Sequence, residues 1–142
     1  MFGSTTQVGS TQALGGMPRS QINVRSISEA EALVLERALA LAAVDPSAAD
    51  LLSQVRTLQV IGRCGCGCAS VDFQRPAPGQ LPSIVADAVA KGPNGEHMGL
   101  IVWALEDRVS GLEVYNFSED SAPLPVLDSI CSYESAGSVD AT

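Results

Sequence analysis

Aromatic residues are scarce in this chain of 142 residues, where Phe, Trp and Tyr together make up 4% of the sequence. Proteins that stack bases on aromatic side chains need more of them, and the net charge of −8 would repel the phosphates of a nucleic acid. No apolar run reaches the roughly 18 residues that a membrane-spanning helix needs. We therefore expect neither a nucleic acid nor a membrane as a partner.

Basic residues are nearly absent from the last third of the chain. Residues 96–142 hold nine acidic residues and one basic residue, Arg108, whereas residues 1–95 hold seven of each. One interpretation of this imbalance is an acidic surface for a basic protein or peptide, with Glu113, Glu119 and Asp120 as the contact residues. The alternative is that the charge only keeps the protein in solution, as most charged runs do.

Common catalytic motifs are also missing. The sequence has no G-x-S-x-G, no P-loop, no dinucleotide-binding glycine pattern and no H-E-x-x-H. Its single histidine, His97, is expected beside an exposed turn, where polar residues are common. The chain is therefore predicted to be a small, acidic, non-enzymatic binding protein with a regulatory or immunity-like role.

Cysteine is present in an unusual cluster. Cys64, Cys66 and Cys68 lie in G-R-C-G-C-G-C, and Cys131 stands alone far downstream. Four cysteines are too few for a secreted disulfide scaffold. The sequence also shows no basic segment followed by an apolar segment, which is the pattern of a secretory signal. We expect a cytoplasmic protein with reduced or metal-bound thiols.

Three interpretations of the cysteine cluster remain open. The cysteines pack as small apolar core residues, which the period-two alternation of the preceding strand favours. Alternatively, the three thiolates bind Zn²⁺ or Cu⁺, with Cys131 or His97 as a fourth ligand, although zinc sites usually use C-x-x-C spacing. The third interpretation is a cysteine-dependent redox protein. Without the metal, no cofactor is expected.

The chain divides into an arm, a domain and a tail. Residues 1–26 lack acidic residues and are rich in Gly, Ser, Thr and Gln, which predicts a disordered N-terminal arm. Residues 27–131 form a single domain, and residues 132–142 a flexible tail. Either Met1 or Met17 could be the native start.

Two helices are expected at the beginning of the domain. Ser28 followed by Glu31 is the pattern of a capping box, and the segment after it is rich in Ala and Leu. Asp45 is expected to cap a second helix, with Pro46 as its first residue and an apolar stripe along 48–55.

Strands follow these helices. Leu58 and Val60 are apolar at even positions and Val71 and Phe73 at odd ones, so a turn or a bulge must lie in or beside 64–70. We expect a hairpin with its turn in this cysteine segment. A meander of three further strands is predicted over 83–91, 98–105 and 112–117, with turns at 92–95 and 106–111 and with Trp103 in the core. The predicted fold is α+β, with two N-terminal helices packed on an antiparallel β-meander of about five strands.

The segments VIGRCGCGCASVDF (60–73) and LEDRVSGLEVYNFSEDSAPLP (105–125) resemble a set of small uncharacterised bacterial proteins. Those proteins have a helical N-terminus, a G-R-C-G-C-G-C segment and a later turn of the D-G-R type. The resemblance covers roughly residues 29–127 and departs at Glu106-Asp107-Arg108, where an Asp-Gly-Arg turn is expected. It implies helices followed by a meander, and no activity.

Overall fold

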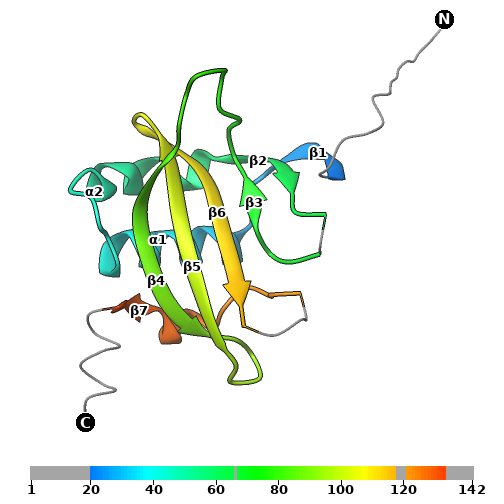
Figure 1. Cartoon of the computed structure of the whole chain (residues 1–142), viewed down its shortest axis with the longest axis vertical. Coiled ribbons are helices and arrows are strands. Elements are labelled where there is room, and N and C mark those ends of the chain that lie inside the picture. The colour runs from blue at the N-terminus through cyan, green and yellow to red at the C-terminus, as the bar shows by residue number, and fades with distance from the viewer. Residues whose placement is uncertain (1–19, 66, 118–120, 134–142) are drawn as a thin grey trace, which may run out of the picture.

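The computed structural model describes residues 20–65, 67–117 and 121–133. Its elements, in chain order, are β1 (Ser20–Ser26), α1 (Glu29–Leu41), α2 (Ala48–Leu51), the 3₁₀ helix η2 (Leu52–Thr57), β2 (Gln59–Arg63), β3 (Val71–Asp72), β4 (Ser83–Lys91), β5 (His97–Leu105), β6 (Arg108–Asn116), the 3₁₀ turn η3 (Leu127–Ser129) and β7 (Cys131–Ser132) (Figure 1). No helix among the described residues is long and apolar enough to cross a membrane.

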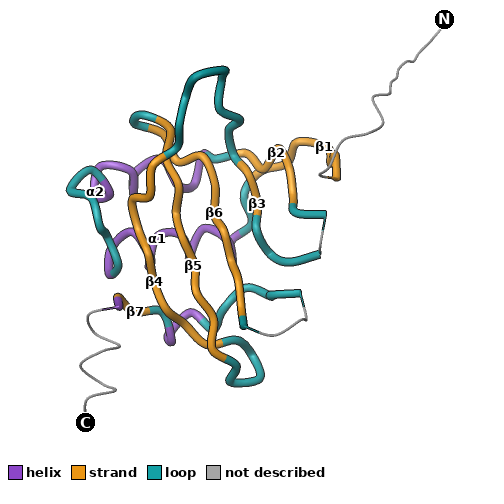
Figure 2. The backbone as a smooth tube through the Cα atoms, in the orientation of Figure 1, coloured by secondary structure: helices purple, strands orange, loops and turns teal. Residues whose placement is uncertain are grey.

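The strands form one seven-stranded sheet in the order β1-β2-β3-β6-β5-β4-β7, and every pair is antiparallel. Helices α1, α2 and η2 lie on one face of β4, β5 and β6, and no described helix covers the other face (Figures 1 and 2). The predicted α+β class and the meander β4–β5–β6 are confirmed. The sheet has seven strands rather than about five because β1 and β7 extend it at its two edges.

Helix α1 begins where the sequence predicts. The Ser28 hydroxyl accepts a hydrogen bond from the Glu31 amide, and the Glu31 carboxylate accepts one from the Ser28 amide, which completes the capping box. The helix then buries Leu35, Ala38 and Leu39 against the sheet. Small residues on β4, such as Ala88, let the helix approach the strands closely.

The second helix starts later than expected. Asp45 does not cap it, because its Oδ1 accepts hydrogen bonds from the amide and hydroxyl of Ser47, both at 2.9 Å, in a local turn. Pro46 lies in that turn, and α2 begins at Ala48. The predicted apolar stripe is confirmed, since Ala48, Leu51 and Val55 are buried.

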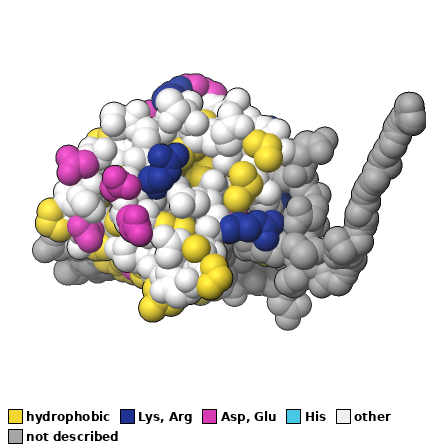
Figure 3. Space-filling view, turned by 90° about the horizontal axis from the view of Figure 1, so that it is seen from above, with side chains coloured by type: hydrophobic (Ala, Val, Ile, Leu, Met, Phe, Trp, Pro, Cys, Tyr) yellow, Lys and Arg dark blue, Asp and Glu magenta, His cyan; other side chains and the backbone are white. Residues whose placement is uncertain are grey.

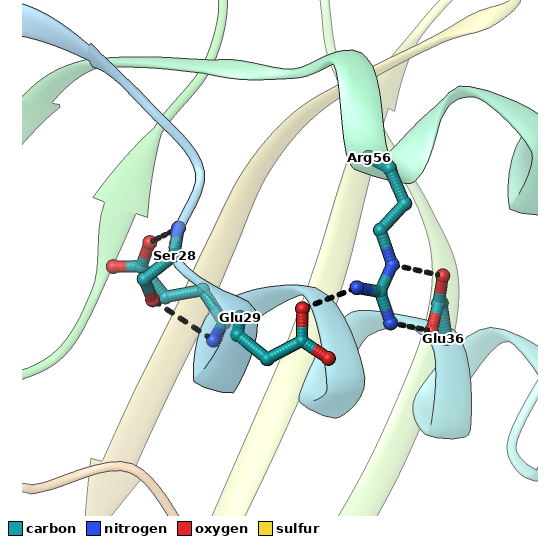
Figure 4. A network of polar contacts seen from close by, with 5 residues as sticks. Ser28, Glu29, Glu36 and Arg56 are labelled. Carbon is teal, nitrogen blue, oxygen red and sulfur yellow. Dashed lines mark hydrogen bonds and ion pairs between the residues drawn. The ribbon is translucent and has the colours of Figure 1, made fainter.

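Arg56, in the last turn of η2, joins this short helix to α1 across the surface (Figure 4). Its Nε and Nη2 donate to the Glu36 carboxylate at 2.9 and 3.0 Å, and its Nη1 donates to Glu29. All three side chains reach solvent, so these ion pairs connect the two helices but contribute little to the free energy of unfolding.

The expected arm was wrong over its last seven residues, because Ser20–Ser26 forms β1 and pairs with β2. At its C-terminal end, Ser26 pairs with Gln59, and Arg25 forms an ion pair with the buried Glu31 of α1. Residues 1–19 lie outside the described part. The expected tail also begins too early, since Ser132 belongs to β7, which pairs with β4; residues 134–142 lie outside the described part.

Two tight turns connect the meander. Gly95, with φ of 82°, closes the β4–β5 loop in the left-handed conformation that glycine adopts freely. The β5–β6 turn was predicted to span 106–111, but Glu106 and Asp107 alone make it, and β6 starts at Arg108. The longer turn was expected because Ser110 and Gly111 are typical loop residues, yet both are buried within β6.

Candidate functional site

The candidate site lies on the face of β4, β5 and β6 that faces away from α1, which we call the outer face. Residues directly opposite each other on antiparallel strands share a face. One row across the outer face is Asp87, Ile101 and Glu113, and a neighbouring row is Ile84, Trp103 and Gly111. The row between them, Ala86, Val102 and Leu112, is buried beneath α1.

Trp103 was expected in the core, but it lies half-buried on the outer face. Its indole Nε1 donates a hydrogen bond to Oε1 of Glu113 at 3.0 Å, from the adjacent strand. The run 98–105 is apolar at every position, so its pattern could not show which residues point away from the helices. The hydrogen bond holds an exposed carboxylate beside an aromatic ring.

A cavity of about 420 Å³ opens on this side of β3 and β6. Its size falls within the range of ordinary ligand sites. Its lining comes from the turn between β2 and β3, from β3, from the loop that follows β3, and from β5 and β6. The lining residues are Cys64, Cys68, Ser70, Val71, Asp72, Gln74, Pro76, Pro82, Trp103, Ser110, Gly111, Leu112, Glu113 and Val114. The cavity therefore brings together two of the predicted cysteines and one of the predicted acidic contact residues.

The cysteine segment is a turn between β2 and β3, as predicted. The Gly67 amide donates to the Cys64 carbonyl at 3.3 Å, and Gly67 has a φ of 90°. The expectation that the cysteines continue the period-two face of β2 was wrong, since that strand ends at Arg63. Cys64 is half-buried and Cys68 is buried.

Ser70 ties the end of this turn to β6. Its hydroxyl accepts a hydrogen bond from the Val114 amide at 2.8 Å and lies 3.2 Å from the Val114 carbonyl oxygen. The side chain thus bonds to backbone groups of β6 just beyond the point where β3 stops pairing with it. This contact fixes the cysteine turn against the end of the cavity.

The expected fourth metal ligands lie elsewhere. Cys131 is on β7, four strands from β3 in the sheet order, which at about 4.8 Å per strand is roughly 19 Å away. His97 is the exposed first residue of β5, paired with Lys91, and does not line the cavity. The structure brings neither of them to Cys64 and Cys68.

Within the described ranges, no three His, Cys, Asp or Glu side chains gather closely enough to hold a metal ion. Cys66 falls outside those ranges. Binding of Zn²⁺ or Cu⁺ by the cysteine segment, and a redox role for its thiols, therefore stay predictions.

Two tyrosines continue the outer face beyond the row of Glu113. The Tyr115 ring lies over Gly99 of β5, because a Cβ built there would come within 2.3 Å of its Cζ. Its hydroxyl lies 3.2 Å from that of Tyr133, and Phe117 packs edge-on against its ring at a centroid distance of 6.0 Å. The hydrogen bond with Tyr133, followed by burial and the nearby charges of Asp87 and Glu113, raises the pKa of Tyr115 to about 12.

Asp87 is the second carboxylate on this face. Burial raises its pKa, and within the described residues its Oδ1 is buried without a hydrogen-bond partner. No pattern in the sequence marks Asp87 as a site residue, because it is a single carboxylate in the alanine-rich segment SIVADAVAK. Of the three predicted contact acids, Glu113 lies on the outer face, while Glu119 and Asp120 fall outside the described residues.

The charges are not spread evenly over the rest of the surface. Seen from the end that carries the β5–β6 turn, acidic side chains gather on one side, with Lys and Arg side chains and separate hydrophobic groups beside them (Figure 3). That end therefore mixes both signs of charge. On the outer face, by contrast, neither Glu113 nor Asp87 has a cationic partner among the described residues.

Comparison with known proteins adds no assignment: no family model, curated protein or solved structure matches this chain.

Proposed function

We propose that this chain is a small, non-enzymatic binding protein that holds a basic protein or peptide against its outer face. The observation that carries the proposal is the pair of Trp103 and Glu113. The indole N–H fixes the carboxylate in place without neutralising it, and the ring beside it is a favourable surface for a cation. A charged group held in this way needs no reordering when a cation arrives.

Asp87 supports the same kind of ligand. A buried carboxylate oxygen without a partner costs free energy, and a cation reaching it would recover that cost. Asp87 and Glu113 stand on either side of Ile101 in one row, so a single basic segment crossing the strands could meet both.

The apolar groups of the outer face indicate a protein or peptide rather than a simple ion. Ile84 is 36% exposed, Tyr133 51% and Phe117 79%. An antiparallel sheet facing water usually carries polar residues on that face, and an exposed apolar patch with a polar rim is typical of an interaction site.

A second copy of the chain fits this face poorly. Two outer faces packed against each other would bring the carboxylates of Asp87 and Glu113 on one copy near those of the other. Like charges buried in an interface are unfavourable, and among the described residues no cation on this face pairs with them. Charge complementarity therefore selects a basic partner.

The proposal is tested with a fluorescently labelled octapeptide of alternating Lys and Arg, whose binding is followed by anisotropy. Glu113→Gln should weaken binding about tenfold, or ~1.4 kcal/mol. Asp50→Asn removes the same charge from α2, in the helix layer, and should change the affinity less than about twofold, because a distant exposed charge is screened by salt. Equal losses in the two variants would show that only the net charge matters and would contradict the proposal.

A further inference from the structure

Two glycines lie inside strands on the outer face, and they differ in what covers them. At Gly99 an added Cβ would lie 2.3 Å from the ring of Tyr115, so this aromatic side chain already occupies the space above the glycine. At Gly111 the nearest atoms to an added Cβ are the Val71 carbonyl oxygen at 3.6 Å and Asp72 Oδ1 at 3.7 Å, and the residue lines the cavity. A glycine inside a strand often marks a place where a ligand approaches the backbone closely.

The groups around Gly111 define what the cavity can hold. Trp103 is directly opposite on β5 and Asp72 directly opposite on β3, and Glu113 follows two residues along β6 on the same face. All three line the cavity, as do Pro76 and Pro82 from the loop between β3 and β4. An aromatic ring and two carboxylates thus surround a floor without a side chain, and apolar proline rings enclose it.

These surroundings favour a guanidinium group over an ammonium group. A guanidinium is planar, stacks on aromatic rings and binds carboxylates through two parallel N–H groups. It is also more weakly hydrated than an ammonium, so it enters a partly apolar cavity at a smaller desolvation cost. An anion would be repelled by the carboxylates of Glu113 and Asp72.

We infer that the cavity over Gly111 binds an arginine side chain of the basic partner, with its guanidinium against the Trp103 ring and within reach of the carboxylates of Glu113 and Asp72. This inference rests on the proposed function, because it specifies which basic side chain the outer face selects and where that side chain lies.

Trp103 is the only tryptophan of the chain, so its fluorescence reports on the cavity directly. The full-length protein is titrated with hexa-arginine amide and, separately, with hexa-lysine amide at the same ionic strength. Hexa-arginine should change the tryptophan emission and bind at least tenfold more tightly than hexa-lysine.

Gly111→Val puts a side chain into the cavity and should abolish the preference for arginine. The new Cβ meets only ordinary van der Waals contacts, and a β-branched residue suits a strand, so the fold should persist. Circular dichroism checks this, and Gly111→Ala replaces the valine variant if that one unfolds. Asp50→Asn again serves as the control, and it should keep the preference.

Each outcome decides. If hexa-arginine is preferred and Gly111→Val removes that preference, the inference is supported. If both peptides bind equally and Gly111→Val binds as the unchanged protein does, the inference fails while the proposed function stands. If neither peptide binds, both fail. If the emission changes with protein concentration alone, a second copy occupies the cavity and the inference is overturned.

Discussion

Glu31 offers the sharpest test of how β1 and α1 are joined. This carboxylate is buried at the third position of α1 and accepts three hydrogen bonds: from the Ser28 amide at 2.9 Å, and from Nη1 and Nη2 of Arg25 at 3.0 and 2.8 Å. Burial alone would raise the pKa of Glu31, but the hydrogen bonds from Arg25 and Ser28 outweigh it and hold the pKa below its ordinary value.

Replacing Glu31 by Gln keeps the size of the side chain and removes its charge. Hydrogen bonds to charged groups contribute about 1.5–3 kcal/mol when they are buried. The Arg25 side chain is 41% exposed, so water screens part of this interaction. We therefore expect Glu31→Gln to lower the free energy of unfolding in urea at pH 7 by about 2 kcal/mol.

Glu36→Gln on the same helix is the matched control, because it also breaks a pair with an arginine, but at the surface. It should cost less than about 1 kcal/mol. Equal costs in the two variants would refute the argument, since they would show that the burial of Glu31 and its contact with β1 add nothing.

The dependence on pH gives a second check on Glu31. Its pKa in the folded protein is lower than in the unfolded chain, so its contribution to stability is complete above the unfolded value of about 4.3 and disappears as the pH falls through the folded value. The difference in unfolding free energy between the unchanged protein and Glu31→Gln should therefore shrink below about pH 4. A difference that stays constant down to strongly acidic pH would count against the assignment.

Two further predictions concern the tyrosine side of the outer face. Gly99→Ala should destabilise the fold by about 2 kcal/mol or more, because the new methyl group would displace the Tyr115 ring, whereas Gly111→Ala should cost less than about 1 kcal/mol; thermal unfolding of the two variants makes the comparison. Tyr115 should ionise near pH 12 in a spectrophotometric titration, and Tyr133→Phe should lower that pKa, because the hydrogen bond between the hydroxyls is its largest cause. A titration of Tyr115 that Tyr133→Phe leaves unchanged would contradict the second prediction.

Local signals in the sequence were sufficient for the centre of the fold. The capping box at Ser28 and Glu31 starts α1 through contacts only three residues apart, and the meander of β4, β5 and β6 is joined by short turns. In each case the residues that fix the element are close together in the chain, so their pattern is visible without the fold.

Elements fixed by distant residues were missed. β1 has no clear alternation, and it becomes a strand because Ser26 pairs with Gln59 and Arg25 meets Glu31. β7 similarly needs β4, since Cys131 pairs with Val89, more than forty residues earlier. Short edge strands of this kind are set by the partner strand rather than by their own composition.

The candidate site was predictable only in part. The cysteine turn and Glu113 were recognised from composition and charge, but their meeting in one cavity depends on β3 pairing with β6. Cys131 and His97 were proposed as ligands because they were the remaining residues of suitable chemistry, and the sheet order places Cys131 four strands away. Spacing along the chain does not reveal such distances.

Trp103 lies on the outer face of the sheet, which no described helix covers. In a uniformly apolar strand, the residues beneath α1 are buried by the helix, and those on the other face remain apolar without a described cover. An exposed apolar sheet face invites self-association. Glu113 and Asp87 stand within that face, and their like charges oppose the pairing of two copies while attracting a cation. On the proposed function, the same carboxylates that oppose the pairing of two copies would select a basic partner.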